Sequence, residues 1–252
     1  MLLAGAAVVG ACSRGIDSTR APRPLSAAER GDAAAQHALA VIYFTGDGVP
    51  ADFGKAASWM RKSADQGFAP AQSDLAELYR IGLGVPTDYT QSAAWFRKAA
   101  EQGYAVAQYN IGTAYRDGQG VPWDDTQAIA WFRHAAEQGD RDAESELASA
   151  FLNGRGVAQN HVQAAMWYRR SAEHGSVEAG YRLGLLYAAG DGVGQDLLAA
   201  LEWLDVAAVR SSGQRKQTID AARDRVARDA TAEQVAEAQR RADARAASLD
   251  AL

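Results

Sequence analysis

The sequence predicts an all-α protein, a solenoid in which a two-helix repeat occurs five times. One tryptophan recurs every 36 residues without an insertion, and a Gly-x-Gly-Val motif recurs at the same spacing. Within each repeat, apolar residues follow the periodicity of one helix face. Fixed repeats of this length are typical of helical solenoids, in which neighbouring repeats bury each other's apolar faces. The repeated tryptophans are Trp59, Trp95, Trp131, Trp167 and Trp203.

The first helix of each repeat, helix A, is clearest in the second repeat. Pro70 stands in the first helical turn, where its missing N–H costs nothing. Gly82 ends the helix, because glycine accepts the left-handed backbone that closes many helices. The apolar residues between them fall at i, i+4, i+7 and i+8 of one face: Ala71, Leu75, Leu78 and Tyr79.

The second helix, helix B, begins after the glycine motif. In the second repeat Asp88 is the expected N-cap, with Gln91 three residues on as in a capping box. Gly103 ends the helix. The alanines of helix B leave room for a neighbouring helix, and we expect the tryptophan to fill that space in the core. On this basis Trp131→Ala should cost about 3–5 kcal/mol of stability.

The array is expected to span residues 27–211, and residues 212–252 are expected to form a C-terminal helical cap. Ile219, Ala222 and Val226 make a narrow apolar stripe, and Thr231 with Gln234 predicts the start of a last helix. A solenoid needs such a cap because its open end exposes core. A membrane-surface helix is the alternative, disfavoured by interspersed acidic residues. The inward positions of the last helix should be Val235, Ala238, Ala242 and Leu249.

The N-terminal residues predict a processing segment. The apolar run 2–11 is too short to span a bilayer, and Cys12 follows it directly. Residues 9–12 resemble a bacterial lipobox, which implies lipidation of Cys12, a lipid anchor and a place in the cell envelope, with the outer membrane favoured. No Lys or Arg precedes the run, which leaves ordinary secretion, a packed N-terminal helix or a plain tail as alternatives. Residues 1–12 are thus signal-like, and 13–26, with two prolines, predict a flexible tether.

Composition and motifs exclude several function classes. The net charge of −5 and pI of about 5.4 offer no basic field for nucleic acid. A single cysteine rules out an intrachain disulfide and cysteine-type zinc sites, and the four histidines lack ligand spacing. No nucleophile elbow, phosphate loop or dinucleotide fingerprint is present. We therefore expect no catalytic residue, metal or cofactor, and not an enzyme.

The order A-x-x-x-L-x-x-x-Y, G-x-G-V-x-x-D and A-x-x-W-x-x-x-A-A-x-x-G resembles the Sel1-like repeat family, which is related to tetratricopeptide repeats. The stretch AQSDLAELYRIGLGVPTDYTQSAAWFRKAAEQG carries the whole pattern, and the resemblance covers residues 31–208. It implies a right-handed α/α superhelix whose A helices line the concave side. Some relatives rich in paired cysteines are linked to penicillin binding, which this chain's lone cysteine does not support.

The predicted function is a scaffold or adaptor that binds a protein segment on the concave face. Within helix A the positions that vary between repeats should contact the partner, because Tyr and Arg are enriched at binding hot spots. A cell-wall-directed or other hydrolytic enzyme with a site across repeats is the alternative, and a purely structural oligomer is a third class. Oligomeric state stays open. The predicted contact residues are Ser73, Glu77 and Arg80, then Tyr109, Thr113 and Arg116, then Tyr181 and Arg182.

Overall fold

The computed structural model describes residues 24–250, and within that range every regular element is a helix. The chain divides into two compact units at Asp124, inside the third repeat, and each is described by itself. The first contains α1 (Leu25–Glu29), α2 (Ala33–Thr45), α3 (Phe53–Asp65), α4 (Ala69–Ile81), α5 (Tyr89–Glu101) and α6 (Ala105–Asp117). The second contains α7 (Asp125–Glu137), α8 (Arg141–Asn153), α9 (His161–Glu173), α10 (Val177–Ala189), α11 (Leu197–Val209), α12 (Gly213–Ala227) and α13 (Ala232–Leu249).

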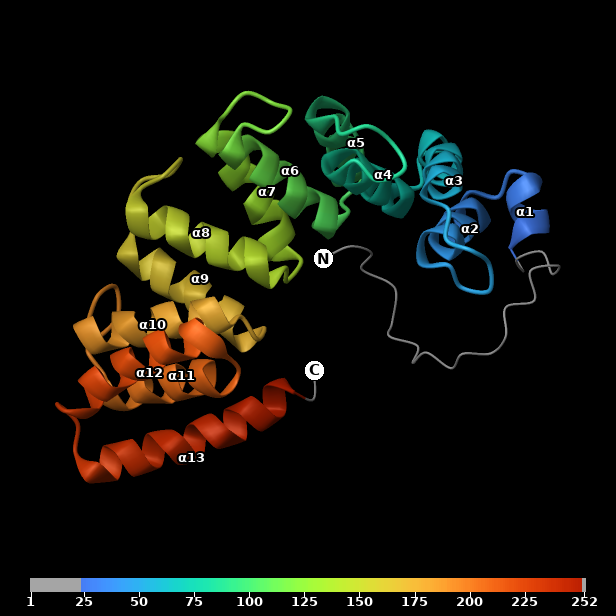
Figure 1. The fold of residues 1–252 in the computed structure, drawn as a ribbon. Coiled ribbons are helices and arrows are strands. Elements are labelled where there is room, and N and C mark those ends of the chain that lie inside the picture. The colour runs from blue at the N-terminus through green and yellow to red at the C-terminus, as the bar shows by residue number, and fades with distance from the viewer. Residues whose placement is uncertain (1–23, 251–252) are drawn as a thin grey trace. The chain divides into compact units, whose positions relative to one another are not determined.

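Helices α2–α11 are the alternating A and B helices of the repeats, each 13 residues long. Within each compact unit every repeat helix packs against the helix that follows it (Figure 1). Each A helix ends at a left-handed glycine whose N–H bonds back to the last turn, as at Gly82 and Leu78. The predicted all-α solenoid of repeats is therefore confirmed.

Besides buried alanines, the core contains one row of large residues from the A helices and one from the B helices. The buried helix-A residues have 0% exposure and are Leu39, Leu75, Ile111, Leu147 and Leu183. The buried helix-B residues each follow the repeated tryptophan, and they are Met60, Phe96, Phe132, Tyr168 and Leu204, at 0–3% exposure. These two rows interdigitate wherever consecutive helices pack, so the apolar area they remove from water stabilises the stack.

The expectation that every repeated tryptophan is a core residue is wrong for three of the five. Trp95 and Trp203 are buried, but Trp59, Trp131 and Trp167 are only half-buried. Two of the half-buried rings instead lie against a cation three residues on: Lys62 Nζ lies 3.9 Å from the centre of the Trp59 ring, and Arg170 lies over the Trp167 ring in the same way. An amphipathic indole suits such a boundary position. Phe132→Ala should therefore cause the larger loss of stability, and Trp131→Ala should cost less than predicted from the sequence.

Glutamine side chains form a buried polar ladder between repeats in the first compact unit. Gln72 Nε2 donates to the carbonyl of Ala64 at 3.1 Å, and Gln102 Nε2 donates to Gln72 Oε1 at 2.7 Å. Gln36 and Gln66 repeat the second bond at the same distance. The ladder satisfies carbonyls at the end of a B helix that would otherwise be buried unpaired.

The fourth repeat replaces this ladder with charges. Glu144 stands at the glutamine position, is 0% exposed, and receives His174 Nδ1 at 2.8 Å. Arg170 Nε lies 2.5 Å from Glu144 Oε1, in an ion pair whose alignment falls short of a hydrogen bond. Burial raises the pKa of Glu144, and its contacts with His174 and Arg170 oppose that rise.

In every repeat after the first, the second glycine of the motif brings neighbouring repeats into backbone contact. A Cβ on Gly120 would lie 1.8 Å from the carbonyl oxygen of Tyr89, the first residue of the preceding B helix. Gly84 meets Phe53 in the same way at 2.1 Å, and Gly192 meets His161 at 2.1 Å. All three have a positive φ near 70°. Glycine is thus required here both for its backbone angle and for the close approach.

The two ends of the array are closed by additional helices. Helix α1 presents Ala28, which is buried, and accepts a bond from Gln36 Nε2 at 3.0 Å, as Ala64 does from Gln72. It therefore occupies the place that the end of a B helix takes at the next junction, and the expected tether does not extend to residue 26. No described helix is long and apolar enough to span a membrane. The expected signal segment and Cys12 lie outside the described residues.

At the C-terminus α12 and α13 both pack against α11, as predicted for a cap. Their buried residues are Ile219, Ala222, Val226, Ala238, Ala242 and Ala246. Thr231 and Gln234 form a full capping box, whereas Asp88 caps α5 without the reciprocal bond. Buried acids of α11 are paired by the cap: Glu202 with Arg245 at 2.7 Å and Asp205 with Arg223 at 3.0 Å.

A pair of glycine substitutions separates the two reasons for glycine. Gly120→Ala and Gly48→Ala both place a side chain at a positive φ, which costs about 1–2 kcal/mol. Only Gly120 faces a neighbouring carbonyl, since nothing lies within 4 Å of a Cβ on Gly48. We expect Gly120→Ala to lower the free energy of unfolding by about 3–5 kcal/mol and Gly48→Ala by far less. Equal losses in urea unfolding would contradict the inter-repeat role.

A rescue experiment tests the charged step in the ladder. Removing both partners with Arg170→Ala and His174→Ala leaves the Glu144 carboxylate buried without a partner, which should cost about 3–5 kcal/mol. Because the pKa of Glu144 is raised in the folded state, its favourable contribution is present in acid and is lost as pH rises. The double variant should therefore be weakest at neutral pH, and adding Glu144→Gln should recover most of the loss. A loss independent of pH and unrescued by Gln would refute this account.

Candidate functional site

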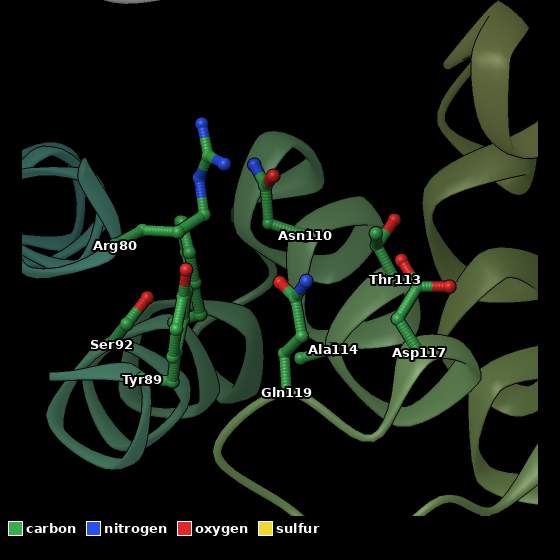
Figure 2. A pocket seen from close by; sticks show the side chains of 9 residues that line it. Arg80, Tyr89, Ser92, Asn110, Thr113, Ala114, Asp117 and Gln119 are labelled. Carbon is green, nitrogen blue, oxygen red and sulfur yellow. The ribbon is translucent and has the colours of Figure 1, made fainter.

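A pocket of about 250 Å³ opens in the first compact unit at the junction of the second and third repeats (Figure 2). Helices α4, α5 and α6 and the loop after α6 contribute its walls. We call it the junction pocket. Its lining residues are Arg80, Tyr89, Ser92, Phe96, Asn110, Thr113, Ala114, Asp117 and Gln119.

Helical periodicity places these side chains together. Asn110, Thr113 and Asp117 stand at i, i+3 and i+7 of α6, so they share one face of that helix. The N-terminal turn of α5 supplies Tyr89, and α4 supplies Arg80 from its last turn. Figure 2 shows Arg80 and Tyr89 on one side of the pocket and the α6 residues on the other.

The charges at the rim are neutralised by their own neighbours. Arg80 donates from Nε and Nη2 to the two carboxylate oxygens of Glu77, each at 2.6 Å. These bonds raise the pKa of Arg80 further. Arg116 contacts both oxygens of Asp117 at 2.8 and 2.9 Å. Such bidentate pairs leave little net field, so the pocket presents mainly neutral polar groups.

Several of those neutral groups retain hydrogen-bonding capacity. The hydroxyl oxygen of Thr113 is buried without a partner among the described residues. Asn110 donates to the Val106 carbonyl at 2.8 Å, which uses its amide nitrogen and leaves its Oδ1 to accept. An unpaired buried hydroxyl costs about 1–3 kcal/mol. A bound group that completes these bonds would recover that cost.

Neighbouring junctions use the same positions to close the space. Asp125 and Arg155 stand 36 residues after Tyr89 and Gln119, at the equivalent positions of the next junction. They form an ion pair at 3.5 Å. The next repeat joins His161 to Asp191 by a hydrogen bond. No such bond links Tyr89 with Gln119 in the described part of the chain.

The junction before the pocket is closed by apolar groups. Phe44 and Phe53, at the positions of Arg80 and Tyr89, pack edge to face with ring centres 5.5 Å apart. Ser92 also departs from the pattern, because every other repeat has alanine at its position: Ala56, Ala128, Ala164 and Ala200. At the junction of the second and third repeats, polar residues therefore line a pocket where the neighbouring junctions are filled by an aromatic pair or an ion pair.

The sequence-predicted contact residues are only partly brought together. Arg80 and Thr113 line the junction pocket, and Glu77 and Arg116 hold its rim charges. Tyr109 is half-buried on α6 and has other contacts.

The remaining three predicted residues lie elsewhere. Ser73 is only 3% exposed and has almost no surface to offer a partner. Tyr181 and Arg182 belong to α10 in the second compact unit, where Arg182 binds Glu178 at 2.6 Å. The prediction missed Tyr89, Asn110 and Gln119, although serine at position 92 in place of the repeated alanine was a signal.

The acids with raised pKa values lie outside the junction pocket. Burial raises the pKa of Asp140, Glu144 and Asp205, and each has a structural partner. Asp140, for example, accepts the N–H of Ala143 at 2.9 Å as the N-cap of α8. Among the described residues no group of three or more His, Cys, Asp or Glu side chains is arranged to hold a metal. The junction pocket is therefore suited to binding by neutral hydrogen bonds.

Comparison with known proteins agrees with the repeat geometry. The model of the Sel1 repeat matches residues 33–68, 69–104, 105–140, 141–176 and 177–208. The chain belongs to the Sel1 repeat family. No curated protein sequence gives a significant match.

Solved Sel1 repeat proteins resemble this chain. A Sel1 repeat protein from Oxalobacter formigenes is 33% identical over 73% of this chain and 76% of its own, with a TM-score of 0.70. A putative Sel1 repeat protein from Klebsiella pneumoniae subsp. pneumoniae is 26% identical over 81% of this chain and 97% of its own, with a TM-score of 0.49. The resemblance predicted from the sequence is confirmed.

Proposed function

We propose that this Sel1 repeat chain is a scaffold that binds a segment of a partner protein across α4 and α6, at the junction pocket. Sel1 repeat proteins generally serve as protein-interaction scaffolds. The observation that carries the proposal is the contrast between junctions: neighbouring junctions are closed by an aromatic pair or an ion pair, whereas this one leaves a pocket in which the Thr113 hydroxyl is unpaired beside Asn110.

Trp123 adds a second argument for binding at this place. It is the one tryptophan outside the repeat register, and it is 66% exposed. A Cβ on Gly118 would contact the Trp123 side chain at 3.6 Å, so Trp123 lies beside the loop that carries Gln119. Exposed aromatic residues next to a pocket are typical anchors of protein interfaces.

The charge arrangement sets the expected character of binding. Because Arg80 and Arg116 are already paired, affinity should come from burial and neutral hydrogen bonds. Binding should therefore change little between low and moderate salt, in contrast to an interface driven by charge.

Matched double variants test the proposed surface. Asn110→Ala with Thr113→Val removes polar groups of the junction pocket, and Tyr181→Ala with Arg182→Ala changes the varying positions of α10 as a control. After cross-linking in cells and mass spectrometry, the first variant should lose the partner enriched by the parent chain, by about tenfold. The control should retain it. Retention by the pocket variant would place binding elsewhere, and enrichment of no protein would contradict the scaffold function.

We also propose that the chain acts in the bacterial cell envelope, anchored through lipid on Cys12. This part rests on residues 9–12, Val-Gly-Ala-Cys, which lie outside the described residues. A lipid anchor would hold the repeat array, with its pocket, close to a membrane.

The anchor has a direct test. In cells fed an alkyne fatty acid, the parent chain should incorporate label and fractionate with membranes, whereas Cys12→Ser should lose the label and become extractable without detergent. Ser13→Ala is the matched control and should keep both properties. Membrane association of Cys12→Ser equal to that of the parent would contradict the anchor and favour secretion or another location.

A further inference from the structure

The junction pocket contains both kinds of neutral hydrogen-bonding group. The hydroxyls of Ser92 and Thr113 can donate, and Asn110 Oδ1 can accept. A bound group that complements them must itself accept and donate. Hydrocarbon side chains fail this requirement, because they would leave the buried Thr113 hydroxyl unpaired.

Charged side chains are also poorly matched. A carboxylate from the partner would meet Arg80 only after competing with Glu77, which already occupies Nε and Nη2 at 2.6 Å. An ammonium or guanidinium group would face Asp117, whose oxygens are engaged by Arg116. Either ion would lose water without gaining a free counter-charge, which is costly in a partly enclosed site.

The size and walls of the pocket narrow the choice. Its 250 Å³ lies below the range of about 300–1,000 Å³ that holds drug-sized ligands, so it suits one or two side chains of a longer segment. Phe96, buried at 3% exposure, and Tyr89 supply aromatic surface. A planar carboxamide can lie against such surface while its edge hydrogen-bonds to Asn110 and Thr113.

We propose that the junction pocket receives the uncharged carboxamide side chain of an Asn or Gln residue from the partner's segment. The carboxamide nitrogen donates to Asn110 Oδ1, and the carboxamide oxygen accepts from the Thr113 hydroxyl. This assignment rests on the proposed scaffold function and names the feature of the partner that this one junction recognises.

The chain itself supplies the design of a closed pocket. The variant Arg80→Phe, Tyr89→Phe, Ser92→Ala, Gln119→Leu copies the residues at the equivalent positions of the preceding junction, namely Phe44, Phe53, Ala56 and Leu83, and so includes the closing pair of aromatic rings. These residues already belong to a folded junction of the same repeat, so the variant should retain its helicity and melting temperature. Thr113→Val, which keeps the shape and removes the hydroxyl, is the minimal second variant.

The test selects phage-displayed random 12-residue peptides on the parent chain and measures the affinity of the enriched sequences. We expect Asn or Gln at one fixed position, with binding weakened about tenfold by the closed-pocket variant, by Thr113→Val, and by Asn→Asp or Gln→Glu in the peptide. Enriched peptides that bind the closed-pocket variant equally well, or that require an acidic, basic or hydrocarbon residue, would overturn the carboxamide assignment and leave the scaffold function standing. Selection of no peptide would count against both.

Discussion

The close backbone approach between repeats is the constraint on which the rest of the structure depends. The second glycine of the motif, as at Gly120, lies so near the start of the preceding B helix that no side chain fits between them. This contact fixes how each repeat sits on the one before it within a compact unit. The buried rows that include Leu75 and Phe96 can then pack in the same register each time. The constant spacing of 36 residues follows, because an insertion would break the contact and both rows together.

A fixed register also makes variation informative. Since the backbone of every junction is held by the same contacts, a change of side chain at one position alters the local surface and little else. Glu144 in place of glutamine shows one outcome, in which the substitution is compensated by Arg170 and His174. Ser92 in place of alanine shows another, in which polar groups accumulate at a junction and a pocket remains. The first kind of change preserves the stack, and the second leaves the pocket that we propose as a recognition site.

The repeat pattern predicted the helices, their caps and the family, because those features depend on local spacing and on glycine positions. It did not predict which of two adjacent residues, Trp131 or Phe132, is the more deeply buried. Phe132 occupies the core, and periodicity alone cannot distinguish adjacent residues on a helix that is covered on two sides. Two of the predicted contact residues line the proposed site. Arg80 and Thr113 were recognised as varying positions, but Tyr89 and Gln119 lie on a B helix and in a loop. Their meeting with α6 depends on tertiary packing, which a search restricted to helix A could not reveal.

The central claim, that recognition is concentrated at one open junction, is tested most directly by a site-specific photo-cross-linking scan in cells. A photoreactive phenylalanine analogue would replace Gln119 and, one at a time, its equivalents Leu83, Arg155 and Asp191. The account predicts a strong cross-linked product with the partner from position 119 and little from the other three. Equal products from all four positions, or a strong product only from one of the closed junctions, would contradict it.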